Sequence, residues 1–318
     1  MGRYLVRRVL QFLPVFFGAT FLIFAFVFVM PGDPIRALSG ERPMPPTVRQ
    51  QLTDRYNLDD PLVVQYAKYI GVIRQDDGRG FSGILQGDFG EDFGGRPVSA
   101  QLRERLPVTA RLALGALCFE TVLGMAAGVL AGLRRSGFVD NLVLVATTAV
   151  ISIPMFVLGI LAQLLLGVKF GIFPVAGLRQ GWISYVLPSM VLGSVSLAFI
   201  ARLLRTSLAE NVRASYARTA IAKGLSRQRV VGLHTLRNAL IPVVTFLGVD
   251  LGFLLSGAVV TETVFNIPGL GRAVFEAVFR QEGFVVVGIV TFLVVVFVVA
   301  NLVVDVLYAI LDPRIRYG

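Results

Sequence analysis

The stretch GFVVVGIVTFLVVVFVVANLVV, residues 283–304, contains no charged side chain. A helix needs about 20 predominantly apolar residues to cross the hydrocarbon of a bilayer, which is roughly 30 Å thick. Residues 283–304 are long enough and apolar enough to do so. One such run can also be a buried helix of a soluble protein, so the rest of the chain has to decide between these two classes.

Five further runs of spanning length carry one charged residue or none. They are residues 9–30, 112–133, 142–168, 181–201 and 239–261. Over the whole chain 55% of residues are hydrophobic and only 16% are charged, which argues against an ordinary globular protein. Together the six runs predict an all-α membrane protein with six spans. We expect the first run to be a retained span, because its apolar region is too long for a cleaved signal peptide.

The distribution of charge predicts the orientation of these spans. With six spans, the two termini and loops 134–141 and 202–238 share one side, where arginine and lysine far outnumber acidic residues. Cytoplasmic loops of membrane proteins carry such an excess, so both termini are expected in the cytoplasm. The formal net charge of +10 then reflects this orientation and requires no nucleic-acid partner.

Three parts are expected along the chain. Residues 1–30 hold the N-terminal tail and first span, residues 31–107 form an extracytoplasmic segment with nearly balanced charges, and residues 108–318 form the core with a cytoplasmic loop at 205–237. In the second part, apolar positions before and after DDP predict two short helices. The glycine-rich stretch 78–95 that follows is either an ordered, turn-rich cap or a flexible loop.

Sequence signatures of catalysis are missing. The chain has no G-x-x-x-x-G-K-[ST] phosphate loop and no H-E-x-x-H motif, so we expect neither ATP binding by this chain nor a zinc site. Cys118 is the only cysteine, which leaves no intrachain disulfide, and the only histidine, His234, lies in a basic segment where a solvated side chain is expected. We therefore predict no catalytic residue, no metal-binding residue and no bound cofactor.

Acidic residues inside the runs are unusual, because charged groups are costly in hydrocarbon. Glu120 and Asp250 lie well inside their runs, whereas Asp305 follows the last run and is expected at the interface. Each intramembrane acid is a candidate for a water-filled pathway or for a partner across helices. For Asp250, in GVDLGFLLSGAVV, lining of a pathway and structural hydrogen bonding remain equally open.

Small residues and prolines predict local geometry within the runs. In GMAAGVLAG, Gly124, Gly128 and Gly132 recur at four-residue spacing and so lie on one helix face, which permits close packing within the chain or against another subunit. Pro154 in SIPMF and Pro242 in ALIPVV each interrupt helical hydrogen bonding, and they predict bends there.

A basic and almost acid-free stretch, SYARTAIAKGLSRQRVVGLHTLRNALIP at 215–242, separates the fourth and fifth runs. At 100° per residue Ala217, Ala220 and Gly224 fall on one narrow stripe of a helix, where another surface can approach closely. Gly224 can adopt a left-handed conformation that ends this helix, and Ser226 is placed to cap the next one. The stretch predicts a helix–turn–helix in the cytoplasm, with a solvated basic loop as the alternative.

YARTAIAKGLSRQRVVGLHTLRNALIPVVT closely resembles the cytoplasmic E-A-A-type loop of permease subunits of binding-protein-dependent ABC importers, in the dipeptide/oligopeptide/nickel class. Further phrases occur in the order found in the first-position (B-type) permease of that class: MPGDP at 30–34, NLDDPLVVQY at 57–66, RLPVTARLAL at 105–114, SIPMF at 152–156, TETVFNIPGLGR at 261–272 and LDPRIRYG at 311–318. The chain departs from the family in lacking the acidic first residue of the loop and in having a longer 75–95 region.

The resemblance implies a type I ABC importer permease fold that forms half of a translocation pathway. In that family the loop, here 214–230, forms a coupling helix that docks into a groove on the ATPase subunit. The residues that the resemblance assigns to ATPase coupling are Tyr216, Ala217, Thr219, Ala220, Lys223, Gly224 and Leu225. Asp250, Ser256 and Pro154 are weaker candidates for the pathway.

The implied partners are a second homologous permease subunit, two cytoplasmic ATPase subunits that bind ATP and Mg²⁺, an extracytoplasmic substrate-binding protein and membrane lipid. The implied location is the cell membrane of a bacterium or archaeon, and the implied cargo is di- or oligopeptides, with nickel complexes and glutathione still open. Two other classes remain as alternatives. One is an ion-coupled secondary transporter in which Glu120 or Asp250 carries a proton, and the other is a membrane scaffold or receptor subunit that transports nothing.

Overall fold

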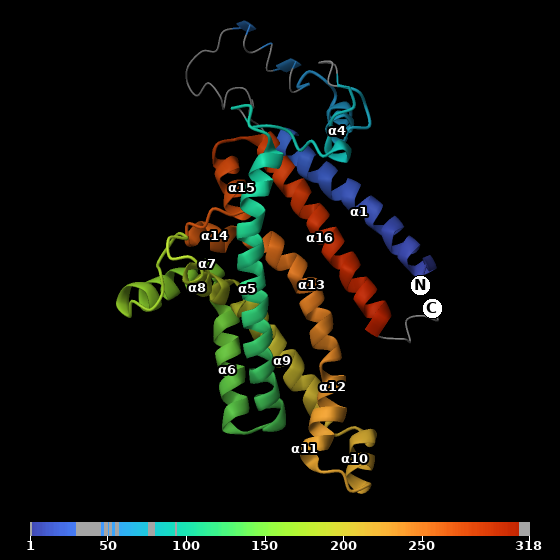
Figure 1. The fold of residues 1–318 in the computed structure, drawn as a ribbon, viewed down its shortest axis with the longest axis vertical. Helices are drawn as coiled ribbons and strands as arrows, with labels where there is room; N and C mark the ends of the chain where they lie inside the picture. The colour runs from blue at the N-terminus through green and yellow to red at the C-terminus, as the bar shows by residue number, and fades with distance from the viewer. Residues whose placement is uncertain are drawn as a thin grey trace. The chain divides into compact units, whose positions relative to one another are not determined.

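The structure is a computed structural model of the 318-residue chain, and it describes residues 2–29, 46–47, 50, 53–54, 57–75, 80–92 and 94–311. The side chains of 2–6, 9, 29, 256–257 and 305–311 are outside this description. Most of the short helix predicted before DDP also falls outside it. The regular elements of the described residues are all helical (Figure 1).

Three straight helices are long and apolar enough to cross a membrane. They are α1 (Gly2–Val29), α5 (Val98–Leu133) and α16 (Gly283–Leu311). They contain the first, second and last of the predicted runs, so the hydrophobicity of those runs identified them correctly.

The other three runs are broken helices rather than straight ones. Helix α6 (Phe138–Ser152) is followed by α7 (Met155–Ala162) and a π-helical turn η2 (Gln163–Lys169), and the two parts meet at 105°. Pro154 stands at this break with extended backbone angles and has no N–H to continue the helix. The bend predicted at Pro154 is therefore confirmed.

The two remaining breaks are less sharp. Helices α8 (Ile183–Leu192) and α9 (Ser194–Asn211) meet at 55°, and the segment Arg227–Ala239 meets α13 (Ile241–Gly257) at 42°, with Pro242 in the first turn of α13. The chain thus has three candidate spans, or up to six if each bent pair is one span. Six remains the upper limit and not a demonstrated number.

The chain divides into two compact units. The first unit contains Met1–Val108 and Pro268–Val299, and the second contains Thr109–Ile267 and Ala300–Gly318. In the first unit the start of α5 packs with α15 (Leu270–Phe279) and the start of α16. Their buried core consists of Val98, Leu102, Leu270, Ala273, Ala277, Val285, Ile289 and Leu293.

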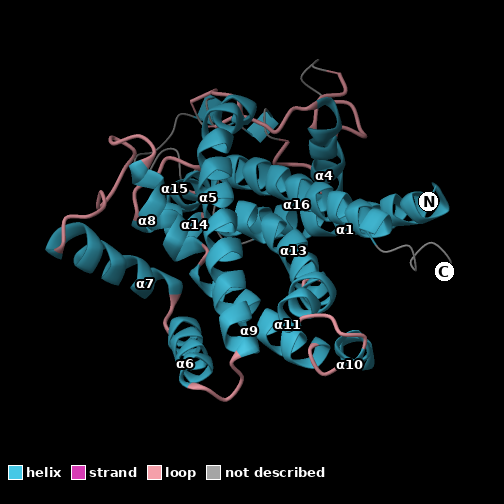
Figure 2. Ribbon diagram, turned by 60° about the horizontal axis from the view of Figure 1, so that its bottom comes forward, coloured by secondary structure: helices cyan, strands magenta, loops and turns pink. Residues whose placement is uncertain are grey.

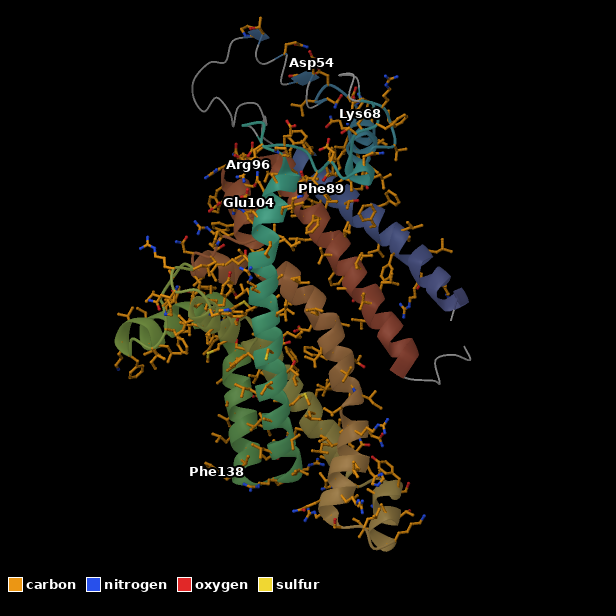
Figure 3. All side chains as sticks on the ribbon, in the orientation of Figure 1. Asp54, Lys68, Phe89, Arg96, Glu104 and Phe138 are labelled. Carbon is orange, nitrogen blue, oxygen red and sulfur yellow. The ribbon has the colours of Figure 1, made fainter. Side chains whose placement is uncertain are left out.

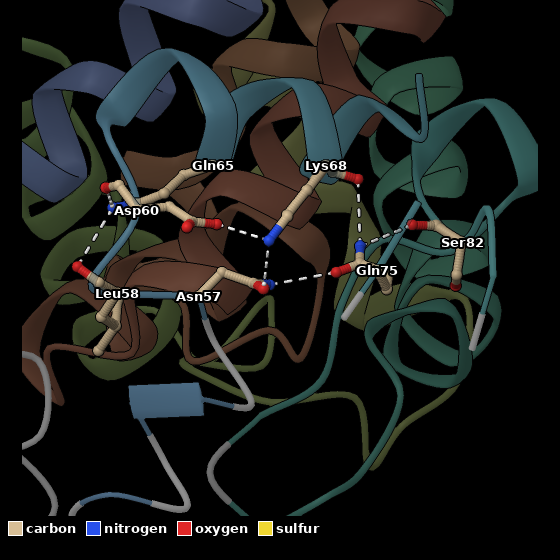
Figure 4. A network of polar contacts seen from close by, with 7 residues as sticks. All are labelled: Asn57, Leu58, Asp60, Gln65, Lys68, Gln75 and Ser82. Carbon is tan, nitrogen blue, oxygen red and sulfur yellow. Dashed lines mark hydrogen bonds and ion pairs between the residues drawn. The ribbon is translucent and has the colours of Figure 1, made fainter. Parts of the chain in front are cut away.

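Polar contacts order the outer part of the first unit. The predicted helix after DDP is α4 (Leu62–Ile70), and its Lys68 donates to Asn57 Oδ1 at 3.0 Å and to Asp60 Oδ2 at 2.6 Å. Gln75 Nε2 then donates to the carbonyls of Lys68 and Ser82 (Figure 4). The described part of the glycine-rich stretch is therefore an ordered, turn-rich cap, including a short 3-10 turn η1 (Ile84–Gln86).

Close backbone contact and one exposed ion pair complete this region. A Cβ at Gly83 would lie 2.4 Å from the nitrogen of Gly71, so the loop can approach α4 only with glycine at this position. Arg96 and Glu104 lie beside each other near the start of α5, at the protein surface (Figure 3). The distance from Arg96 Nη2 to Glu104 Oε1 is 2.6 Å. Exposed pairs of this kind contribute little to stability.

In the second unit α9 is the central element. Its buried residues Ile200, Leu204 and Leu208 form one core with Ala239 and Val243. The glycine face of α5 packs against these same residues of α9. A Cβ at Gly128 would lie 2.8 Å from the carbonyl oxygen of Ala201, and Gly124 and Gly132 approach α9 similarly closely. The close packing predicted for these glycines is therefore confirmed, and it occurs within the chain.

Candidate functional site

The basic stretch folds as a helical hairpin. Helix α10 (Ser215–Ala222) is followed by α11 (Arg227–Arg229), the π-helical turn η3 (Val230–Thr235) and α12 (Leu236–Ala239). Both ribbon views place α10 beside α11 at the end of the unit (Figure 1 and Figure 2). The helix–turn–helix prediction is confirmed, with a π-helical turn that the sequence did not indicate.

Gly224 ends α10 in the conformation that the sequence predicted. Its φ is +85°, in the left-handed region that glycine adopts at low cost. The N–H of Gly224 donates to the Ile221 carbonyl at 2.9 Å, and the N–H of Leu225 donates to the Ala220 carbonyl at 3.2 Å. These two bonds form a Schellman motif, which satisfies carbonyls that a helix end otherwise leaves free. Ser226 begins the next helix, but its side chain makes no capping hydrogen bond.

The residues assigned to ATPase coupling are not all at the surface. Tyr216, Thr219, Lys223 and Gly224 are exposed, and Ala220 and Leu225 are half-buried. Ala217 is different, because its side chain is 1% exposed and α10 packs against η3 through this region. Ala217 therefore holds α10 in place within the chain, whereas its neighbours form the outer surface.

Two exposed apolar residues add to this surface. Ile221 is 54% exposed and Leu233 is 62% exposed. Ile221 lies next to the predicted stripe of Ala217, Ala220 and Gly224, whereas nothing in the sequence indicated that Leu233 is exposed. Its exposure arises in the π-helical turn, where the period of 3.6 residues no longer assigns faces correctly.

Polar side chains connect α9, which leads into α10, to α6. Arg205 donates to Asp140 through both Nε and Nη2, and the Nη2–Oδ2 distance is 2.8 Å. One turn earlier, Arg202 donates to the hydroxyls of Thr147 and Thr148, both at 3.1 Å. A displacement of α10 would consequently act on α6 through α9.

The predicted pathway residues occupy three different environments. Asp250 is 6% exposed and accepts a hydrogen bond from Ser196 Oγ at 2.9 Å. Pro154 stands at the 105° bend, and the side chain of Ser256 lies outside the described part of the structure. Glu120 lies on α5 and is completely buried, and its carboxyl interacts electrostatically with the carboxyl of Asp250.

The described residues contain no cluster of three or more histidine, cysteine, aspartate or glutamate side chains that could hold a metal ion. The structure therefore provides no positive evidence for a metal site in these residues.

Comparison with known families covers most of the chain. Residues 124–317 match the family described as binding-protein-dependent transport system inner membrane component. Residues 1–113 match the N-terminal part described for the membrane component of such systems.

Full-length relatives are named as permease proteins of transport systems. The di/tripeptide transport system permease protein DppB of Pseudomonas aeruginosa (strain UCBPP-PA14) is 36% identical over 345 residues, covering 100% of this chain and 99% of the relative. The glutathione transport system permease protein GsiC of Escherichia coli (strain K12) is 39% identical over 321 residues, covering 100% of both. The dipeptide transport system permease protein DppB of Escherichia coli (strain K12) is 35% identical over 348 residues, covering 100% and 99%.

Solved structures support the fold. A chain from an inward-facing structure of the MetNI methionine ABC transporter superposes with a TM-score of 0.55 at 20% identity, covering 67% of this chain and 96% of that chain. At this identity the likeness concerns the fold alone. The family matches and the full-length relatives establish more: the chain belongs to the inner membrane components of binding-protein-dependent transport systems, as a B-type permease subunit of an ABC importer.

Proposed function

We propose that this chain forms half of the translocation pathway of an ATP-driven importer and that α10 couples it to a cytoplasmic ATPase subunit. The observation that carries the proposal is the exposed α10–α11 hairpin in a chain of this family. A solvated loop that only enforces topology would not need a buried anchor at Ala217 and an ordered helix end at Gly224. These features keep the outer surface of α10 in one orientation, as docking requires.

The proposed docking surface is narrower than the full stripe expected from the sequence. It consists of Tyr216, Thr219, Ala220, Lys223, Gly224 and Leu225, with Ile221 and Leu233 beside them. Ala217 supports this surface from behind. Exposed apolar side chains beside a glycine, which has no side chain, form a surface of low relief that fits a shallow groove on the ATPase subunit.

The proposed topology places α10 and both termini in the cytoplasm and residues 31–107 outside. The excess of arginine and lysine around α10 supports this orientation. The proposed partners are a second permease subunit, two ATPase subunits that bind ATP and Mg²⁺, and an extracytoplasmic binding protein. Membership of this family favours this arrangement over an ion-coupled secondary transporter or a scaffold.

The proposed cargo is short peptides, with glutathione included in that class. Its support is that the full-length relatives are named for di/tripeptide, dipeptide and glutathione transport. The pathway is proposed to pass along α13, which carries Asp250. The bend at Pro154 is proposed to let α7 move relative to α6.

Gly224→Val tests the coupling role of α10. No atom lies within 4 Å of the Cβ that a substitution would add, so the change acts through backbone strain and a bulkier docking surface. Left-handed backbone costs a residue with a Cβ roughly 1–2 kcal/mol. We expect normal membrane insertion and a several-fold loss of ATP hydrolysis stimulated by the binding protein loaded with dipeptide, tripeptide or glutathione.

Gly232→Val is the matched control, because Gly232 also has open space around it but its φ is not positive. The control should retain most of the stimulated ATP hydrolysis. Full stimulation in Gly224→Val would place the interface elsewhere, and stimulation by none of the three cargoes in the unaltered complex would remove the peptide assignment.

A further inference from the structure

Three buried carboxyl oxygens in the second unit have no hydrogen-bond donor among the residues that the structure describes. They are both side-chain oxygens of Glu120 and the Oδ2 atom of Asp250. The two side chains are 0% and 6% exposed. Buried polar groups are almost always paired, so three such oxygens in one place require an explanation.

The site is enclosed by three helices. Glu120 comes from α5, Asp250 from α13, and Ser196 from α9 donates to Asp250 Oδ1 at 2.9 Å. The Glu120 carboxyl lies against the junction of α8 and α9, since a Cβ at Gly193 would stand 3.3 Å from its Oε2 atom. The Asp250 carboxyl meets the same end of α9, since Ser196 lies one turn after Gly193.

Within the part of the chain that the structure describes, no arginine or lysine donates to either oxygen of Glu120 or to Oδ2 of Asp250. The basic residues of α9 are engaged elsewhere, because Arg202 donates to Thr147 and Thr148 and Arg205 to Asp140. Two ionised carboxylates cannot stay side by side in a buried site, since repulsion and desolvation both act against them.

We propose that Glu120 and Asp250 form a proton-binding site, in which one proton is shared between the two carboxyls and joins α5 to α13. A protonated carboxyl is a donor, so Glu120 can donate to Asp250 Oδ2 while Ser196 donates to Oδ1. The proton belongs to the pair and not to one residue, as in other closely coupled acids.

The shared proton has a mechanical consequence. With it, the pair is a link between α5 and α13. Without it, two like charges face each other in a buried site and repel, which separates the two helices. The inference depends only on the contacts of these three residues, and it holds whatever solute the importer carries.

Infrared spectroscopy of the purified transporter complex in lipid nanodiscs at neutral pH tests the proposal directly. A protonated carboxylic acid has a C=O stretching band that an ionised carboxylate lacks. We expect this band in the unaltered complex and its loss in Glu120→Gln, whereas Asp250→Asn should shift the band, because the buried Glu120 keeps a proton but loses its carboxyl partner. Asp140→Asn is the control, because Asp140 is buried but ionised against Arg205 and its change should leave the band intact.

Absence of the band in the unaltered complex, its persistence in Glu120→Gln, or an unshifted band in Asp250→Asn would overturn the proposal. These measurements include the unaltered complex, so the proposal remains testable even if a variant does not assemble.

Thermal unfolding against pH is the second measurement. The folded protein holds a proton that the unfolded chain releases at neutral pH, so stability should fall as pH rises from neutral to alkaline. Glu120→Gln should lose this part of the pH dependence, since its amide keeps a donor at every pH. If melting instead depends on sodium concentration at constant pH, the site holds a metal cation and the proton assignment is wrong.

Discussion

The second unit contains buried acids in two contrasting environments. Asp140 is 1% exposed, is bound by two nitrogens of Arg205 and accepts the Ser136 N–H at 2.8 Å. Glu120 and Asp250 are buried to a similar degree, but the described residues offer them only the Ser196 hydroxyl. An acid next to the basic loop can obtain an arginine, whereas an acid in the middle of an apolar helix must lower its charge or be satisfied by neutral donors.

Arg205→Ala is expected to lower the free energy of unfolding more than the other variants, because it leaves Asp140, like Glu120 and Asp250, without an arginine partner. It would remove the two charged hydrogen bonds to Asp140, and a hydrogen bond to a charged group contributes about 1.5–3 kcal/mol. The measurement is the thermal or denaturant-induced unfolding of the purified complex. Arg134→Ala is the control, since Arg134 is exposed on the adjoining loop.

A loss of stability no larger than that of Arg134→Ala would show that solvent, and not Arg205, compensates Asp140. The contrast between the two environments would then disappear.

Gly128→Ala is expected to affect both environments together. Helix α9 supplies Arg205 to one acid and Ser196 to another, and Gly128 sets its distance from α5. An added Cβ would lie 2.8 Å from both the Ala201 carbonyl oxygen and the Leu204 Cβ, so overpacking should cost about 1–3 kcal/mol.

Gly18→Ala is the matched control in another candidate span. No atom lies within 4 Å of the added methyl group, and alanine is the better helix former by roughly 0.5–1 kcal/mol. Thermal unfolding should therefore show opposite signs for the two substitutions. Equal signs would mean that the glycine face does not determine the α5–α9 distance.

Ser196→Ala should give the smallest effect and sharpens the comparison. It removes the Ser196 hydroxyl that donates to Asp250, and a single hydrogen bond contributes about 1 kcal/mol. Ser194→Ala is the control on the same helix, because Ser194 donates only to the Val191 carbonyl one turn back. If the two serine variants unfold at the same temperature, Asp250 does not rely on Ser196.

Much of the candidate site could be predicted locally. The end of α10 follows from one glycine and its neighbours, since left-handed backbone is inexpensive only without a Cβ. The glycine face of α5 follows from the four-residue spacing. The exposure of Leu233 could not be predicted in this way, because a π-helical turn changes which residues share a face, and the burial of Ala217 depends on the packing of α10 against η3.

The sequence by itself determined that the chain is an all-α membrane protein in which Gly224 ends a helix, because hydrophobic run length and glycine geometry are properties of short segments, and its motifs resembled one permease family. Only the tertiary structure decided that the run around Pro154 bends through 105° and that Glu120, Ser196 and Asp250 form one cluster. These three residues lie on three different helices, and no periodicity within a helix determines which faces of separate helices meet. That pairing depends on the packing of whole helices, which the glycine face of α5 against α9 adjusts to a fraction of an ångström.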